Sequence, residues 1–186
     1  MAKNKSVYRL LFPIAVCLCM LPARYNVAQT GLRSAARSVM SPRDKLREVY
    51  TAELGVREAT GHNDGQRVGQ YLAYCSLRQG RQWCAAFVSW CYGRIGRAAP
   101  HNPWAPALVP DGRLVYKQGK ALTRQPMPGD VFGIYHAGMR RVAHVGFVDS
   151  WEQRYALTVE GNSHDAVERR RRPHATIYKV ADWVSL

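Results

Sequence analysis

Cysteine, acidic side chains and long apolar runs are all scarce in this sequence of 186 residues. The 5 cysteines are an odd number, which excludes a fully paired disulfide framework in an intact monomer. With 13 Asp and Glu against 27 Lys and Arg, the formal net charge is +14. Such a balance is typical of proteins that bind nucleic acid, anionic membranes or other acidic polymers. The apolar fraction of 47% excludes a disordered polar chain, and the length suits one domain.

The longest apolar segment lies near the N-terminus, at residues 10–21. It is shorter than the roughly 20 residues of a membrane-spanning helix, and Pro13 interrupts it. Basic residues precede it and small residues follow it, which is the layout of a secretory signal peptide. We therefore predict a signal peptide at 1–28, cleaved after Ala23 or Ala28, and export of the chain to the periplasm or the outside of a bacterial cell. A buried N-terminal helix or an uncleaved anchor is the alternative interpretation.

Removal of residues 1–28 would change both the charge and the cysteine count. Four positive charges and no negative ones would leave with this segment, so the mature chain would carry +10. Three cysteines would remain, namely Cys75, Cys84 and Cys91. In an oxidising compartment two of them could pair and one stay free. We interpret Cys91 as a small buried hydrophobic residue and leave both possibilities open for Cys75.

The first half of the mature chain is predicted to be helical. Residues 29–42 are small, polar and basic and are predicted to form a flexible lead-in to a domain at 43–186. Ser41 followed by proline is typical of a helix start, and apolar residues recur at helical spacing up to Leu54. The same spacing predicts two further helices, at about 66–75 and 83–95.

The second half is predicted to be a sheet. Residues 97–128 are rich in proline and are predicted to form a long surface loop. After them come short β-rich runs separated by turn residues. Helices followed by strands indicate an α+β fold with an antiparallel sheet of about five strands. The five runs are 131–135, 144–149, 154–160, 167–172 and 177–184.

Cys84 is the sharpest chemical clue, because it lies in the first turn of the helix predicted at 83–95. Free amides and the positive end of the helix dipole favour a thiolate there. No Ser, Thr, Asp or Asn directly precedes Cys84 as a cap, so these amides could stabilise an oxyanion. Alternatively, Cys84 is simply the first core residue of an apolar helix.

A cysteine nucleophile needs a base, and the base needs an orienting group. His144 opens one of the predicted strands, where its imidazole can reach a helix N-terminus. Glu160 and Asn162 end the next strand, and their spacing of two places both on one face of the sheet. Either side chain could accept the imidazole N–H and fix its tautomer.

Four segments together resemble the successive signatures of the CHAP domain, the cysteine, histidine-dependent amidohydrolase/peptidase family. The resemblance is strong over 80–162 and looser from Glu58 to Trp183. The segments are Trp-Cys-Ala-Ala-Phe-Val at 83–88, Pro-Gly-Asp-Val at 128–131, His-Val-Gly-Phe-Val at 144–148 and Val-Glu-Gly-Asn at 159–162.

This resemblance implies a papain-like fold, related to the NlpC-type cell-wall hydrolases, and a cysteine peptidase or amidase. The implied reaction cleaves an amide bond in peptidoglycan through a thioester acyl-enzyme. It implies Cys84 as nucleophile, His144 as base and Glu160 as the orienting carboxylate, with Asn162 as a further polar member of the site. Asp130 is interpreted as part of a structural turn and is left out of catalysis.

The substrate and partner predictions follow from the same reading. Gln82, Trp83 and Trp104 are candidates to line the substrate groove, although a core role is equally open for the two tryptophans. The predicted partner is a peptidoglycan peptide or amide, with no stable membrane span in the mature chain and a monomer assumed. No cofactor and no metal are predicted, because the histidines and the three mature cysteines form no CxxC or HxxxH pair.

The run of four arginines at 169–172 favours other interpretations. It is typical of a nucleic-acid or heparin patch. On a strand, however, the arginines would alternate between faces, and a charged strand edge protects against aggregation. No nucleic-acid-binding motif accompanies the run, so we predict no nucleic-acid partner. Two functional alternatives remain, namely a catalytically inactive CHAP-like domain that binds the wall or a partner, and an exported antibacterial amidase toxin.

Overall fold

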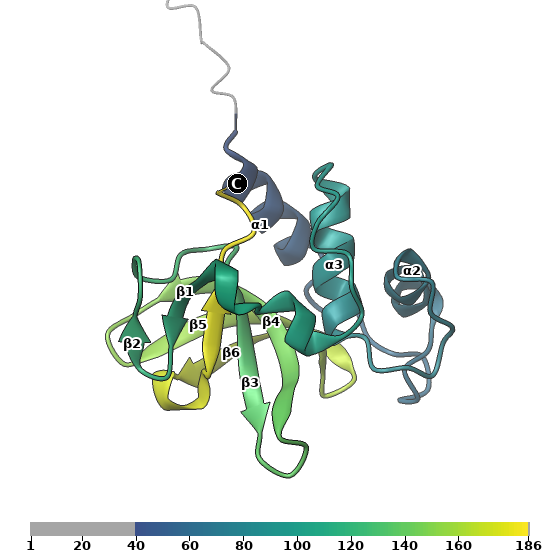
Figure 1. Ribbon diagram of the computed structural model, residues 1–186. Coiled ribbons are helices and arrows are strands. Elements are labelled where there is room, and N and C mark those ends of the chain that lie inside the picture. Colours follow the sequence, from purple (N-terminus) through teal and green to yellow (C-terminus); the bar gives the residue numbers. More distant parts are fainter. Residues whose placement is uncertain (1–39, 186) are drawn as a thin grey trace, which may run out of the picture. The chain divides into compact units, whose positions relative to one another are not determined.

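The computed structural model describes residues 40–185 of the chain. The predicted signal peptide and nearly all of the predicted lead-in lie outside the described residues. Three α-helices come first and are followed by a seven-stranded sheet (Figure 1). None of the helices in the described part is long and apolar enough to cross a membrane. The helices are α1 (Pro42–Ala52), α2 (Gln66–Tyr74) and α3 (Cys84–Arg94), with short 3-10 helices η1 (Ala105–Leu108), η2 (Asp111–Arg113) and η3 (His174–Thr176).

The three predicted helices are confirmed, with ends that differ by a few residues. At the start of α1, the Ser41 hydroxyl accepts a hydrogen bond from the Asp44 amide at 3.1 Å, and Pro42 occupies the first turn. Both features fix the first helical residue, because they satisfy or remove amides that lack a partner within the helix. Helix α3 differs from α1, since no side chain caps its N-terminus at Trp83.

The α+β fold is confirmed, but the predicted count of about five strands is wrong. The five predicted runs form β3 to β7, and the sheet order is β2-β1-β7-β3-β4-β5-β6 with antiparallel neighbours. The two additional strands lie in the predicted surface loop and are too short to show alternation. Strand β1 is stabilised by pairing with β7, far along the chain, where Tyr116 lies opposite Val180, and β2 pairs with β1 at the edge of the sheet. The strands are β1 (Leu114–Lys117), β2 (Lys120–Ala121), β3 (Val131–His136), β4 (Arg141–Trp151), β5 (Tyr155–Ser163), β6 (Ala166–Pro173) and β7 (Lys179–Ala181).

The sheet is strongly curved. Tyr116 of β1 and Trp151 of β4 have ring centroids only 4.9 Å apart. Three strand spacings separate β1 from β4 in the sheet order, which would be about 14 Å in a flat sheet. The concave face therefore encloses a small apolar cluster of its own, made by Val115, Tyr116, Phe132, Val148, Ala156, Ile177 and Val180.

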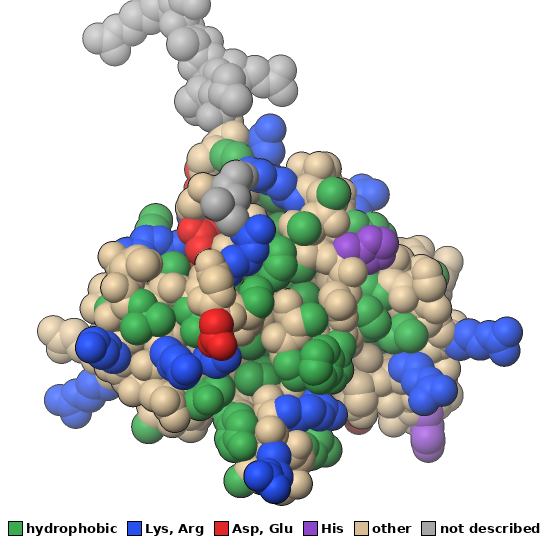
Figure 2. All heavy atoms as spheres, in the orientation of Figure 1, with side chains coloured by type: hydrophobic (Ala, Val, Ile, Leu, Met, Phe, Trp, Pro, Cys, Tyr) green, Lys and Arg blue, Asp and Glu red, His purple; other side chains and the backbone are tan. Residues whose placement is uncertain are grey.

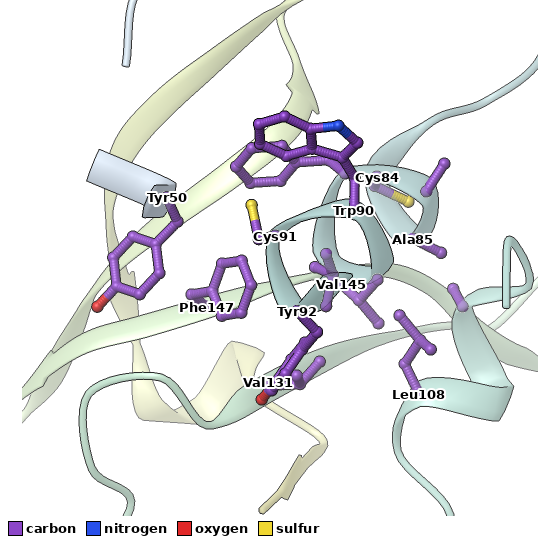
Figure 3. Packing of buried hydrophobic residues seen from close by; sticks show 14 of the residues in the cluster. Tyr50, Cys84, Ala85, Trp90, Cys91, Tyr92, Leu108, Val131, Val145 and Phe147 are labelled. Atoms are coloured by element: carbon purple, nitrogen blue, oxygen red, sulfur yellow. The ribbon is translucent and has the colours of Figure 1, made fainter. Parts of the chain in front are cut away.

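The main core lies between the helices and the other face of the sheet. Every residue of α3 from Cys84 to Tyr92 is buried, because this helix packs on β4 and β5 and also contacts α1 and α2. Figure 3 shows the contacts around it, with Phe147 of β4 near Cys91 and Tyr92. Tyr50 of α1 stacks on Phe147 with ring centroids 4.6 Å apart. This packing fixes the N-terminus of α3 against the sheet.

Asp130 ties α1 to the start of β3. Its carboxylate has no exposed surface and accepts hydrogen bonds from Arg43 of α1 at 2.8 Å and from Arg124 at 2.6 and 2.9 Å. Both arginines also reach Asp182, just after β7. Asp130 is thus part of a buried ion-pair network, in agreement with its interpretation as a structural residue.

Candidate active site

Cys84 is the first residue of α3 and lies where that helix meets the sheet. Its side chain is almost completely buried, with 6% of the residue exposed. The first amides of a helix have no partner within it, and no side chain caps this one. The helix start therefore presents N–H groups and a partial positive charge to the thiol.

The surroundings of the Cys84 sulfur favour the thiolate. Burial alone would raise the pKa of this thiol, but a hydrogen bond with His144 and the charge of that imidazole lower it below its ordinary value. The backbone amides of Val145 and Ala85 also hydrogen-bond to the sulfur and act in the same direction. One donor comes from the helix and the other from β4, so the site depends on the contact between these two elements.

His144 on β4 links the thiol to a carboxylate. Its Nε2 lies 2.8 Å from Glu160 Oε2, which leaves Nδ1 as the ring nitrogen for Cys84. Burial lowers the pKa of His144, but the bonds to Cys84 and Glu160 outweigh this effect and raise it to about 9. Both shifts favour a thiolate and imidazolium pair at neutral pH.

Glu160 on β5 is completely buried and holds the far side of the imidazole. Burial would raise its pKa, but Arg172, His144 and Thr158 lower it to about 2, so the carboxylate is ionised. Thr158 Oγ1 donates to Glu160 Oε1 at 2.5 Å. Gly146 on the neighbouring strand β4 leaves room for the Glu160 side chain. A Cβ at position 146 would lie 2.8 Å from the Val159 carbonyl oxygen and 3.1 Å from Glu160 Cγ.

Asn162 forms its side-chain hydrogen bonds with residues other than His144. Its amide nitrogen donates to Gln82 Oε1 at 2.8 Å and to Asn63 Oδ1 at 3.1 Å. Of the two side chains that could orient His144, Glu160 is therefore the one in contact with it. Asn162 has a φ of +58°, and the pairing of β5 with β6 shifts register between Glu160 and Ser163. This bulge removes Asn162 from the regular alternation on which the same-face prediction depended.

Trp83 does not line a groove, contrary to the prediction, because its side chain has no exposed surface. It stacks on Tyr71 with ring centroids 5.5 Å apart, and its indole N–H donates to Glu58 at 2.8 Å. Glu58 also accepts the Asn63 amide at 2.6 Å, so it joins the residue before Cys84 to the loop that contacts Asn162. Glu58 is a site residue that no local sequence pattern distinguishes from a solvated glutamate.

The other two groove candidates are exposed. Gln82 precedes the buried pair Trp83 and Cys84 and lies at the surface beside Asn162. Trp104 is 57% exposed and directly precedes η1, which packs against β4 and α3. Their role in binding a substrate remains a prediction.

Arg172 was also missed as a member of the site. It lies on β6, and its Nε and Nη2 donate to Glu160 Oε1 and Oε2 at 2.8 and 2.6 Å. The predicted alternation of the arginine run is confirmed, with positions 170 and 172 half-buried and 169 and 171 exposed. The other three arginines also have partners within the chain, namely Asp149 for Arg169, Glu168 for Arg170 and the Tyr155 ring for Arg171.

These pairings do not favour a nucleic-acid patch at 169–172. Figure 2 shows Lys and Arg side chains spread over the viewed face and not gathered in one place.

Cys75, Cys84 and Cys91 are all free, and burial raises the pKa of Cys75 and Cys91. Within residues 40–185 no group of three His, Cys, Asp or Glu side chains could hold a metal ion.

Comparison with known proteins identifies the segment that contains Cys84, His144 and Glu160. Residues 76–162 match the family model of the CHAP domain. No curated protein sequence matches the chain. Among solved structures, the chain is similar to a mutated form of the Resuscitation Promoting Factor Interacting protein RipA, with 13% identity and a TM-score of 0.41. That alignment covers 78% of this chain and 63% of the other, less than two thirds of its length.

Proposed function

We propose that this chain, whose residues 76–162 form a CHAP domain, is a cysteine hydrolase that cleaves an amide bond in peptidoglycan. The observation that carries the proposal is the hydrogen-bonded series from Cys84 through His144 to Glu160. A nucleophile, a base in contact with it and a group that orients the base are the parts that covalent amide hydrolysis requires.

The first step is attack by the Cys84 thiolate on the carbonyl carbon of the substrate amide. A bond forms between sulfur and carbon, and the carbonyl electron pair moves to oxygen. The donors that we propose for this oxyanion are the amides at the start of α3, which no side chain caps. Gln82 adds a candidate donor, because its Oε1 is occupied by Asn162 and its amide nitrogen is left to donate.

The second step breaks the carbon–nitrogen bond. His144, which holds a proton in the ion pair, gives it to the leaving amine, and a thioester with Cys84 remains. Water then attacks the thioester while His144 takes a proton from it, and the free acid leaves with the thiolate restored. Glu160 stays ionised and keeps the imidazole in one orientation throughout.

The substrate proposal is a peptide or amide of the cell wall, which is located outside the cytoplasm. This agrees with the predicted export to the periplasm or the outside of a bacterial cell. Gln82 and Trp104 are the exposed side chains that we propose to contact the substrate.

The test is digestion of purified sacculi by the full chain, with release of new amino groups measured and the products identified by mass spectrometry. We expect the wild type to release amines and Cys84→Ala to release none while circular dichroism shows an unchanged fold. The matched control is Cys75→Ala, because Cys75 is buried and free but has a raised pKa and should retain activity. Equal release by wild type and Cys84→Ala would exclude the proposal, and no release by either would favour a non-catalytic wall-binding domain.

A further inference from the structure

The Arg172 side chain bonds to a residue on β5 that is not its partner in the strand register. In the register of β5 and β6 it lies opposite Ala156, whereas Glu160 lies opposite Glu168. Its side chain therefore extends along β5, past Thr158, to reach the carboxylate. Only 24% of this side chain is exposed. The neighbouring Arg170 instead bonds to Glu168 and His164, and Arg171 lies over the ring of Tyr155.

The contact of Arg172 occupies both oxygens of Glu160. Nη2 donates to Oε2 at 2.6 Å, the same oxygen that lies 2.8 Å from His144 Nε2. Nε donates to Oε1 at 2.8 Å, which also accepts from Thr158. A two-point contact of this kind prevents rotation of the carboxylate, as a single ammonium would not. The orientation of the oxygen that faces His144 is therefore set from β6.

We propose that Arg172 is a positioning residue, whose guanidinium keeps the Glu160 carboxylate ionised and turned toward His144 and thereby maintains the Cys84 thiolate. This inference rests on the proposed function and deepens it. A fully buried carboxylate with only an imidazole and a hydroxyl as partners would tend to take up a proton. A protonated Glu160 would no longer stabilise the imidazolium, and the thiolate would lose its counterion.

The charged groups around Glu160 agree on the direction of this effect. His144 faces it from β4, Arg172 from β6, and Cys84 lies beyond His144 on α3. Glu168, its register partner on β6, is turned to His164 and Arg170. Without Arg172, Glu160 either becomes neutral or stays ionised with one cation fewer nearby. Both outcomes disfavour the thiolate, so both move the thiol titration to higher pH.

The test measures the titration of Cys84 in the full chain without any peptidoglycan. The ultraviolet absorbance of the thiolate is recorded against pH, and the Cys84→Ala spectrum is subtracted to remove other cysteines and tyrosines. We expect Arg172→Met to raise the midpoint by about one pH unit, a tenfold smaller thiolate fraction below it. Arg170→Met is the matched control and should leave the midpoint unchanged, because Arg170 does not contact Glu160.

The outcomes separate this inference from the proposed function. A folded Arg172→Met variant with the wild-type midpoint would overturn the role of Arg172 and leave the Cys84–His144 pair intact. A wild-type midpoint at the value of an ordinary thiol would instead contradict the proposed function. If Arg172→Met does not fold, Arg172→Lys decides, because it keeps the charge and loses the two-point contact. We expect it to raise the midpoint by a smaller amount, and no rise would overturn the proposal.

Discussion

Asp130 and Glu160 are both completely buried carboxylates, and each is bound by an arginine through both oxygens. Their other partners differ. Asp130 also contacts Arg43, which carries a permanent charge, whereas Glu160 also contacts His144. The charge distribution around Asp130 is therefore fixed, while a proton can move beside Glu160. An arginine fork is thus common to both buried carboxylates, and the third partner decides whether the carboxylate faces a permanent cation or a group that can gain and lose a proton.

The largest expected effect that separates the two sites is that of Glu160→Gln on activity. The amide cannot carry the negative charge that holds the imidazolium, and its N–H₂ group can face His144 Nε2 and favour the wrong tautomer. We expect kcat/KM for amine release from sacculi to fall by about 10² to 10⁴-fold, the usual contribution of general acid–base catalysis. Circular dichroism and the melting temperature report whether the fold is retained.

The control for this change is Asp130→Asn, which removes the charge from the other buried carboxylate. Breaking a buried ion pair costs about 3–5 kcal/mol, so the melting temperature should fall strongly. Activity per folded molecule at low temperature should remain close to that of the wild type. A loss of activity as large as that of Glu160→Gln, in a folded Asp130→Asn protein, would show that the two sites are not functionally distinct.

The pH dependence of the reaction sharpens the same comparison. The pKa of His144 is raised from 6.5 to about 9, so its proton is present throughout the neutral range and is lost as pH rises through about 9. We expect kcat/KM to fall about tenfold per pH unit above that value, because the protonated form is required for the ion pair and the leaving amine. Asp130→Asn should show the same fall in kcat/KM above pH 9. A fall in kcat/KM that begins near pH 6.5 in the wild type would contradict the raised pKa of His144.

The helices, the main strands and the pair Cys84 and His144 could be predicted from the sequence because their signals are local. Ser41 marks a helix start, and apolar spacing marks the buried face of α1, with Leu46 and Tyr50. Cys84 and Cys91 show the limit of such patterns. They lie seven residues apart on one helix, and only the position of Cys84 at the first turn indicates a reactive thiol.

The residues that were missed depend on contacts between distant segments. Arg172 reaches Glu160 only because β6 pairs with β5 in one particular register, and Glu58 reaches Trp83 only after the chain has folded back on itself. Strand β1 is stabilised by β7, more than 60 residues later by number. The left-handed backbone at Asn162 likewise redirects a side chain that simple alternation would have placed beside Glu160. No pattern within a short window carries this information.

The smallest effect is expected from Thr158→Val, which removes one neutral donor from Glu160 and keeps the shape of the side chain. The carboxylate retains both bonds from Arg172 and the contact with His144, so its charge and orientation should persist. We expect the free energy of unfolding, measured by urea denaturation, to fall by about 0.5–1.5 kcal/mol, the usual net value of one hydrogen bond. The activity should change by less than about threefold, because this hydrogen bond is lost equally from the ground state and the transition state. A drop as large as that of Glu160→Gln would mean that the hydroxyl, and not the guanidinium, sets the orientation of the carboxylate.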